Sequence, residues 1–163
     1  MRGVVSREGA ALSETESLAI LGGADYGVLA TVNALGQPSV IALNHVMLDR
    51  RTLVFHCKLE GEKIDNIRQN PAVSFFVLGQ EQVHPAAFET SYTSVVAHGS
   101  ARLVTDEAER RQSLEALVAR FVGDFVPEAK KADCVEKGAP VTAIIKMTIE
   151  HLTGKTRPAP AEK

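Results

Sequence analysis

The sequence contains no tryptophan and only two cysteines, and 5% of its 163 residues are aromatic. Cys57 and Cys134 lie far apart, so they predict neither a disulfide scaffold nor a cysteine metal site. No window approaches the 18 or more apolar residues of a membrane-spanning helix. The charged stretch at residues 1–8 also differs from the apolar centre of a signal peptide. These absences predict a cytoplasmic protein with an aliphatic core and no membrane partner.

The chain has no excess of positive charge, because 18 Lys and Arg residues face 20 Asp and Glu residues, a formal net charge of −2. Nucleic-acid-binding domains usually carry a basic patch or stripe, so no nucleic-acid partner is expected. The five histidines lack ligand spacings such as HExxH, which predicts no metal site. Nor is there a GxSxG motif to supply a serine nucleophile.

The length of the chain predicts one domain, here over residues 13–154, with an N-terminal arm at 1–12 and a flexible tail at 155–163. Ser13 and Glu16 form a capping-box pattern that predicts a short helix ending at the glycines 22–23. Two further helices are predicted, at residues 61–69 and 106–122. Six strands are predicted, at residues 28–32, 39–46, 52–57, 72–78, 92–104 and 141–152.

Residues 79–91 and 123–140 are predicted as a polar loop and a polar connection. Several of the predicted strands are apolar on both faces, so barrel closure or another subunit is expected to cover them. Closure also removes exposed strand edges. The sequence therefore predicts an α+β fold built on a six-stranded antiparallel β-barrel with flanking helices.

The stretch from residue 56 to residue 64 joins a strand end, a glycine-containing turn and a helix start, with Lys58 and Lys63 on either side of the turn. Free N–H groups at a helix N-terminus suit a phosphate group. The alternative is that both lysines only solvate the helix start, since the stretch lacks the fixed spacing of a P-loop. His56 and Cys57 are adjacent in a strand and point to opposite faces, so they cannot form a nucleophile–base pair.

Several stretches that follow one another in the sequence resemble the flavin-binding split barrels related to pyridoxamine 5′-phosphate oxidase. The similarity is closest to the nitroimidazole-resistance branch of that family, and it runs from about residue 13 to residue 157. The stretches that carry it are residues 37–44, 52–56, 61–71, 92–103 and 149–155.

The resemblance implies a six-stranded split barrel that forms a homodimer with FMN in two clefts at the interface. The strand at 40–44 is expected to lie along the isoalloxazine ring. The strand end and helix start at 56–64 are expected to surround the ribityl chain and phosphate, and residues 94–95 to make contacts from the second subunit. The cofactor-binding residues so implied are Val40, Ile41, Ala42, Leu43, Asn44, His56, Cys57, Lys58, Gly61, Lys63, Ile64, Ser94 and Val95.

The same resemblance gives His56 a catalytic role close to the flavin; the alternative is that His56 only hydrogen-bonds the phosphate or a neighbouring strand. Two positions depart from the family pattern: Ala42 replaces a proline, and His45 replaces an aromatic residue. These changes predict a flavin face that is more open or more polar than usual. The chain also lacks the C-terminal substrate motif of true pyridoxamine phosphate oxidases, which argues against vitamin B6 oxidation.

Three functions follow from these observations. The first is an FMN-dependent oxidoreductase that takes electrons from a small-molecule donor and passes them to a small acceptor, for example a nitroaromatic or nitroimidazole compound. The second is a flavin-binding carrier or sensor without turnover of its own. The third is a haem-binding member of the same fold, with His56 or His98 as axial ligand, an idea that rests on fold analogy.

Overall fold

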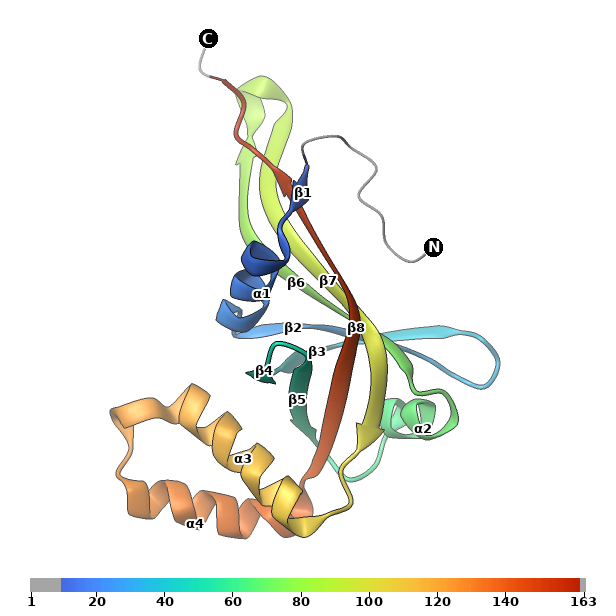
Figure 1. Ribbon diagram of the computed structural model, residues 1–163, viewed down its shortest axis with the longest axis vertical. Coiled ribbons are helices and arrows are strands. Elements are labelled where there is room, and N and C mark those ends of the chain that lie inside the picture. The colour runs from blue at the N-terminus through green and yellow to red at the C-terminus, as the bar shows by residue number, and fades with distance from the viewer. Residues whose placement is uncertain (1–9, 162–163) are drawn as a thin grey trace.

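One antiparallel sheet of eight strands forms the body of the protein in the computed structural model, which describes residues 10–161 (Figure 1). Seven strands follow the order β3-β2-β6-β7-β8-β5-β4, and β1 pairs with β8. The strands are β1 Ala11–Leu12, β2 Tyr26–Val32, β3 Pro38–Asn44, β4 Val46–Asp49, β5 Thr52–Cys57, β6 Ala72–His84, β7 Glu89–Leu103 and β8 Ala143–Arg157.

The predicted split barrel with flanking helices is confirmed, but it has eight strands where six were predicted. One extra strand arises because the predicted strand at 39–46 is interrupted at His45, which separates β3 from β4. These two strands lie at opposite ends of the sheet order, so the chain crosses the open seam of the barrel at His45. The other extra strand is β1.

In the described part of the chain, four α-helices flank the sheet: α1 Glu14–Gly23, α2 Glu62–Gln69, α3 Glu107–Val122 and α4 Glu128–Gly138. The predicted capping box is confirmed, since the Ser13 hydroxyl accepts the Glu16 backbone N–H at 3.2 Å and the Glu16 carboxylate accepts the Ser13 N–H at 2.8 Å. In Figure 1, α3 and α4 lie together near one end of β8, and α1 lies further along it. Across residues 10–161, the helices are too short or too polar to cross a membrane.

The core consists of two apolar clusters on opposite faces of the sheet. Phe55 and Phe75 pack edge to face inside the barrel, with ring centroids 4.9 Å apart, and both are fully buried. Val54 and Ile144 alternate with the inward-facing residues and are buried beneath α3 and α4. The middle of β5 is therefore covered on both faces, which explains the three consecutive apolar residues at 53–55.

The predicted loop at 79–91 is instead the outer part of a long hairpin. β6 runs to His84 and β7 begins at Glu89, and a short 3₁₀ turn at Pro85–Ala87 joins them. The polar connection predicted at 123–140 contains α4, of which only Val135 is buried. Both elements have polar sequences because much of their surface faces water, so hydrophobic periodicity did not reveal them.

Strand pairing extends beyond residues 13–154 at both ends. Residues 155–157 continue β8, where Lys155 pairs with Ser94 of β7 and with Ala11 of β1. The strand β1 therefore lies within the predicted arm, and the first part of the predicted tail belongs to the sheet. Residues 1–9 of that arm and 162–163 of that tail lie outside the described residues.

Candidate functional site

β3 forms one end of the sheet and presents apolar side chains to solvent. Among the described residues it pairs with β2 alone, so its other edge carries backbone N–H and C=O groups without a strand partner. Val40 is 67% exposed and Ile41 is 42% exposed, which is unusual for such residues in a strand. The predicted flavin strand is thus an accessible apolar edge that can hydrogen-bond through its backbone.

The turn between β5 and α2 leaves the N-terminus of α2 open. Gly61 precedes the helix with a φ of 134°, a conformation that favours glycine, and no side chain caps the first turn. A Cβ at Gly61 would meet no atom within 4 Å, so the helix start faces open space. Lys58 is exposed, and Lys63, the second residue of α2, is half-buried. The uncapped N–H groups and the two cations make this turn suitable for a phosphate.

A buried hydrogen bond and two isoleucines hold α2 in place. The Asn66 side-chain amide donates to the Thr31 hydroxyl of β2 at 2.9 Å, and both residues are buried. Ile64 and Ile67 of the same helix are buried in the barrel core. The helix start is therefore fixed relative to β2, the strand that carries β3.

His56 and Cys57 lie on opposite sides of β5, as the strand geometry predicts. His56 is exposed, whereas Cys57 is half-buried against the barrel core. Burial raises the pKa of the Cys57 thiol, and the nearby Lys63 ammonium opposes this shift only in part. Cys57 therefore stays protonated at neutral pH and is not an activated nucleophile.

The remaining predicted site residues do not all reach this surface. Ile64 and Val95 are fully buried in the core, so their side chains are not available to a ligand. Ser94 is half-exposed on β7, which is separated from β3 by β2 and β6. In a single chain, Val40, Ile41, Ala42 and Asn44 of β3 are exposed, and so are His56, Lys58 and Gly61 around the turn, whereas Leu43 and Cys57 are half-buried against the core. Ser94 stays apart from β3.

Exposed apolar residues extend the β3 surface across neighbouring strands. Tyr26 of β2 and Phe76 and Leu78 of β6 are all exposed. Phe76 pairs with Val28, which in turn pairs with Ala42 of β3, so they lie in one cross-strand row. These three residues were not among the predicted site residues, although the prediction of strands that are apolar on both faces was a signal for them.

The histidines of the sheet have different environments. His45 is 1% exposed, its Nε2–H donates to the Leu21 carbonyl at 2.7 Å, and its ring packs edge to face on Phe75 at 4.7 Å. Burial lowers the pKa of His45, which is therefore neutral. The expectation that His45 makes the flavin face more polar is wrong, because its side chain points into the core.

His98 of β7 lies between Ser74 of β6 and His151 of β8 in one row across the sheet. Its Nδ1 hydrogen-bonds the Ser74 hydroxyl at 2.7 Å, and its ring stacks near that of His151 with centroids 6.2 Å apart. Within residues 10–161, no three His, Cys, Asp or Glu side chains cluster so as to hold a metal ion.

Comparison with known proteins agrees with this architecture. One similar structure is a conserved hypothetical protein from Mycobacterium tuberculosis, with a TM-score of 0.79, 19% identity and 98% of each chain covered. Another is described as a candidate 5-nitroimidazole antibiotic resistance protein from Bacteroides thetaiotaomicron, with a TM-score of 0.72, 19% identity, and 90% of this chain and 86% of that chain covered.

A third similar structure is an FAD-binding protein from Mesorhizobium loti, with a TM-score of 0.66, 24% identity, and 91% of this chain and 97% of that chain covered. A search of curated proteins gives no significant match. The model of the pyridoxamine 5′-phosphate oxidase family matches residues 13–156. Because this match spans the barrel, from the start of α1 almost to the end of β8, the chain belongs to the pyridoxamine 5′-phosphate oxidase family.

Proposed function

We propose that the protein is an FMN-binding oxidoreductase that acts as a homodimer in the cytoplasm and passes electrons from the reduced flavin to a small acceptor. The observation that carries this proposal is the open N-terminus of α2, on a helix whose Asn66 bonds Thr31 of β2, the residue that pairs with Ser39 of the accessible apolar strand β3. A phosphate group suits the helix start, and a flat, mostly apolar ring suits β3. The two cysteines are free thiols, in keeping with a reducing compartment.

The phosphate is assigned to the turn around Gly61. The first backbone N–H groups of α2 carry the positive end of the helix dipole, and Lys63 adds a full positive charge. Gly61 suits this role because the backbone of any other residue at this position would have to adopt an unfavourable φ. Lys58 adds charge from the other side of the turn.

The flavin ring is assigned to β3, where Val40 and Ile41 are exposed. The unpaired edge of the strand can donate to and accept from the polar rim of the ring through its backbone. The flavin itself supplies the redox chemistry when it is bound, and the protein binds and orients it. Backbone N–H groups aimed at the rim also stabilise negative charge on the reduced ring.

We assign the contact with a second copy of the chain to the apolar row of Ala42, Val28 and Phe76, in which Ala42 and Phe76 are exposed and Val28 between them is half-buried. Apolar patches of this kind in a soluble protein commonly mark an interface. A partner would also bring its own Ser94 towards the β3 surface, which a single chain leaves apart. The site in this proposal is complete only in the dimer.

The acceptor is proposed to be a nitroaromatic compound. Support comes from the similar structure described as a 5-nitroimidazole antibiotic resistance protein. His56 is exposed at the end of β5, next to the proposed phosphate turn, and is the candidate to hold or deliver a proton at its ring nitrogen.

A titration with FMN and with riboflavin tests this assignment, with the oligomeric mass measured in the same samples. We expect one FMN per chain in a dimer, and tighter binding of FMN than of riboflavin because riboflavin lacks the phosphate. Lys63→Gln is expected to weaken FMN binding about tenfold or more and to leave riboflavin binding unchanged. Lys137→Gln is the matched control, since Lys137 is exposed and paired with Asp133 on α4.

The catalytic part is tested with His56→Ala, which we expect to abolish reduction of a nitroimidazole and to spare FMN binding. Equal affinity for FMN and riboflavin would contradict the assignment of the phosphate to the turn around Gly61. If neither flavin binds, the proposed flavin-dependent function is wrong. A Soret band in the purified protein would then point to haem instead. The released flavin, separated by chromatography, distinguishes FMN from FAD.

A carrier or sensor is the alternative within the same cofactor class. In that case the chemically reduced flavoprotein would reoxidise in air at the same rate whether or not a nitroimidazole is present. Faster reoxidation with the nitroimidazole supports the oxidoreductase.

A further inference from the structure

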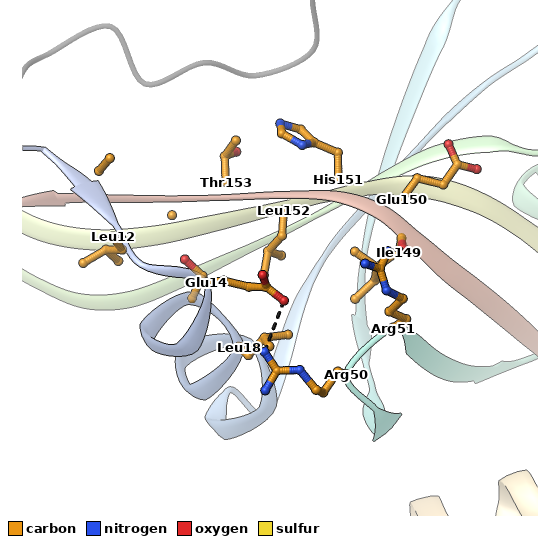
Figure 2. A pocket seen from close by; sticks show the side chains of 13 residues that line it. Leu12, Glu14, Leu18, Arg50, Arg51, Ile149, Glu150, His151, Leu152 and Thr153 are labelled. Atoms are coloured by element: carbon orange, nitrogen blue, oxygen red, sulfur yellow. Dashed lines mark hydrogen bonds and ion pairs between the residues drawn. The ribbon is translucent and has the colours of Figure 1, made fainter.

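A second surface of the protein has the features of a small-molecule site. A cavity of about 460 Å³ lies between α1, β8 and the turn that joins β4 to β5 (Figure 2). The turn lies at the start of β5, whereas His56 and Cys57 lie at its end. The length of β5, roughly 16 Å at 3.3 Å per residue, therefore separates the cavity from the proposed phosphate turn.

The floor of the cavity is apolar and comes from three elements. Leu12 belongs to β1, Leu18 to α1, and Ile149 and Leu152 to β8. In a regular strand, residues 149 and 152 would point to opposite faces. Here Glu150 is an extra residue in the pairing of β7 with β8, and this bulge turns both side chains towards α1.

Two consecutive arginines, Arg50 and Arg51, form one rim of the cavity (Figure 2). Arg50 Nη2 lies 3.2 Å from the Glu14 carboxylate, and both side chains are 67% exposed, so the pair is weak. Arg51 Nη1 lies 3.5 Å from the Ile149 carbonyl oxygen, a long hydrogen bond. These contacts use one guanidinium nitrogen of each arginine.

The charges at this rim favour an anion. Glu14 is one carboxylate opposite two guanidinium groups. The other acidic residue of the cavity, Glu150, points to the far side of β8 in Figure 2, and so does His151. The planar guanidinium of arginine binds carboxylates through two parallel hydrogen bonds, a geometry that Arg51 can offer at the edge of an apolar floor.

We propose that this cavity binds a small organic carboxylate with an apolar body. Arg51 holds the carboxylate, Arg50 adds positive charge beside it, and the apolar body lies on Leu12, Leu18 and Leu152. The volume is within the range of small-molecule pockets. The proposal does not depend on flavin binding.

Octanoate is the probe, and calorimetric titration of the full-length protein, both as purified and with FMN added, measures its affinity. We expect one octanoate per chain, and much weaker binding of the neutral 1-octanol. Arg51→Met, which keeps the apolar stem, is expected to weaken octanoate binding about tenfold or more. Arg111→Met is the matched control, because Arg111 is also exposed but lies on α3, outside the cavity.

A tryptophan placed in the cavity locates the binding, because the chain has no tryptophan of its own. The emission of Leu12→Trp is expected to shift with octanoate at the affinity that calorimetry gives. The emission of Phe125→Trp is expected to stay unchanged, since Phe125 is fully exposed and outside the cavity. Equal affinity of Arg51→Met and the parent would overturn the proposal, as would equal binding of octanol and octanoate or no binding at millimolar concentration.

Discussion

Asn66 connects α2 to the barrel wall through one buried hydrogen bond, and its removal has a calculable cost. Asn66 and Thr31 are 3% and 2% exposed, so neither side chain has water as a ready substitute partner. In Asn66→Ala the hydrogen bond is lost, which costs about 1 kcal/mol, and the Thr31 hydroxyl is left without this partner in the interior, which costs about as much again. We therefore expect a loss of about 2 kcal/mol in the free energy of unfolding.

The double variant Asn66→Ala with Thr31→Val separates the hydrogen bond from other effects. Valine has nearly the shape of threonine and needs no partner, so the double variant is expected to be more stable than the sum of the single effects predicts, by about 1 kcal/mol. Urea unfolding followed by circular dichroism measures all four proteins. Gln69→Ala, on the exposed side of α2, is the control and is expected to change stability by less than about 0.5 kcal/mol.

The same variants connect stability with the proposed site. Because Asn66 holds the helix whose N-terminus is assigned to the phosphate, Asn66→Ala is also expected to weaken FMN binding more than riboflavin binding. Strict additivity of the single effects, or a loss below about 0.5 kcal/mol in Asn66→Ala, would refute the reasoning about the buried hydrogen bond.

Two further predictions concern the sheet and its buried histidine. Gly99→Ala is expected to cost more than about 3 kcal/mol or to prevent folding, because its Cβ would collide with the backbone carbonyl of Thr148; Gly23→Ala, with no neighbour within 4 Å, is the control. Thermal unfolding of both variants checks this. Burial lowers the pKa of folded His45 below its ordinary value of 6.5, so stability is expected to fall as pH drops below about 6.5, where only the unfolded state gains the proton. His45→Phe should flatten this dependence between pH 6.5 and 5 in urea unfolding, and an unchanged slope would contradict it.

Elements with strong local signals were predictable from the sequence. The capping box of Ser13 and Glu16 marks the start of α1, because both of its hydrogen bonds are made within one turn. The start of α3 is marked by a signal of the same local kind, because the Asp106 carboxylate accepts the Glu109 backbone N–H within one turn. The outer hairpin of β6 and β7 and the helix α4 were missed because their polar sequences carry no hydrophobic period.

Part of the candidate site was also accessible from sequence. The turn around Gly61 with Lys58 and Lys63 was identified from its residues, and the structure places it at an uncapped helix start. The open space in front of Gly61 was not predictable, because it depends on what other segments leave uncovered. The burial of Val95 was not predictable either, because its neighbour Ser94 on the same strand is half-exposed.

The sequence by itself determined the family, the order of the segments, and the local chemistry of the turn at residues 56–64. Tertiary structure alone decided which side chains face water, since a one-residue change in strand register moves a side chain to the other face. It turned His45 into the core and left Val40 outside. It also placed Arg51 beside Ile149, which is distant in sequence, through the pairing of β5 with β8 and the bulge at Glu150. Such contacts follow from long-range pairing and barrel closure, which no local pattern encodes.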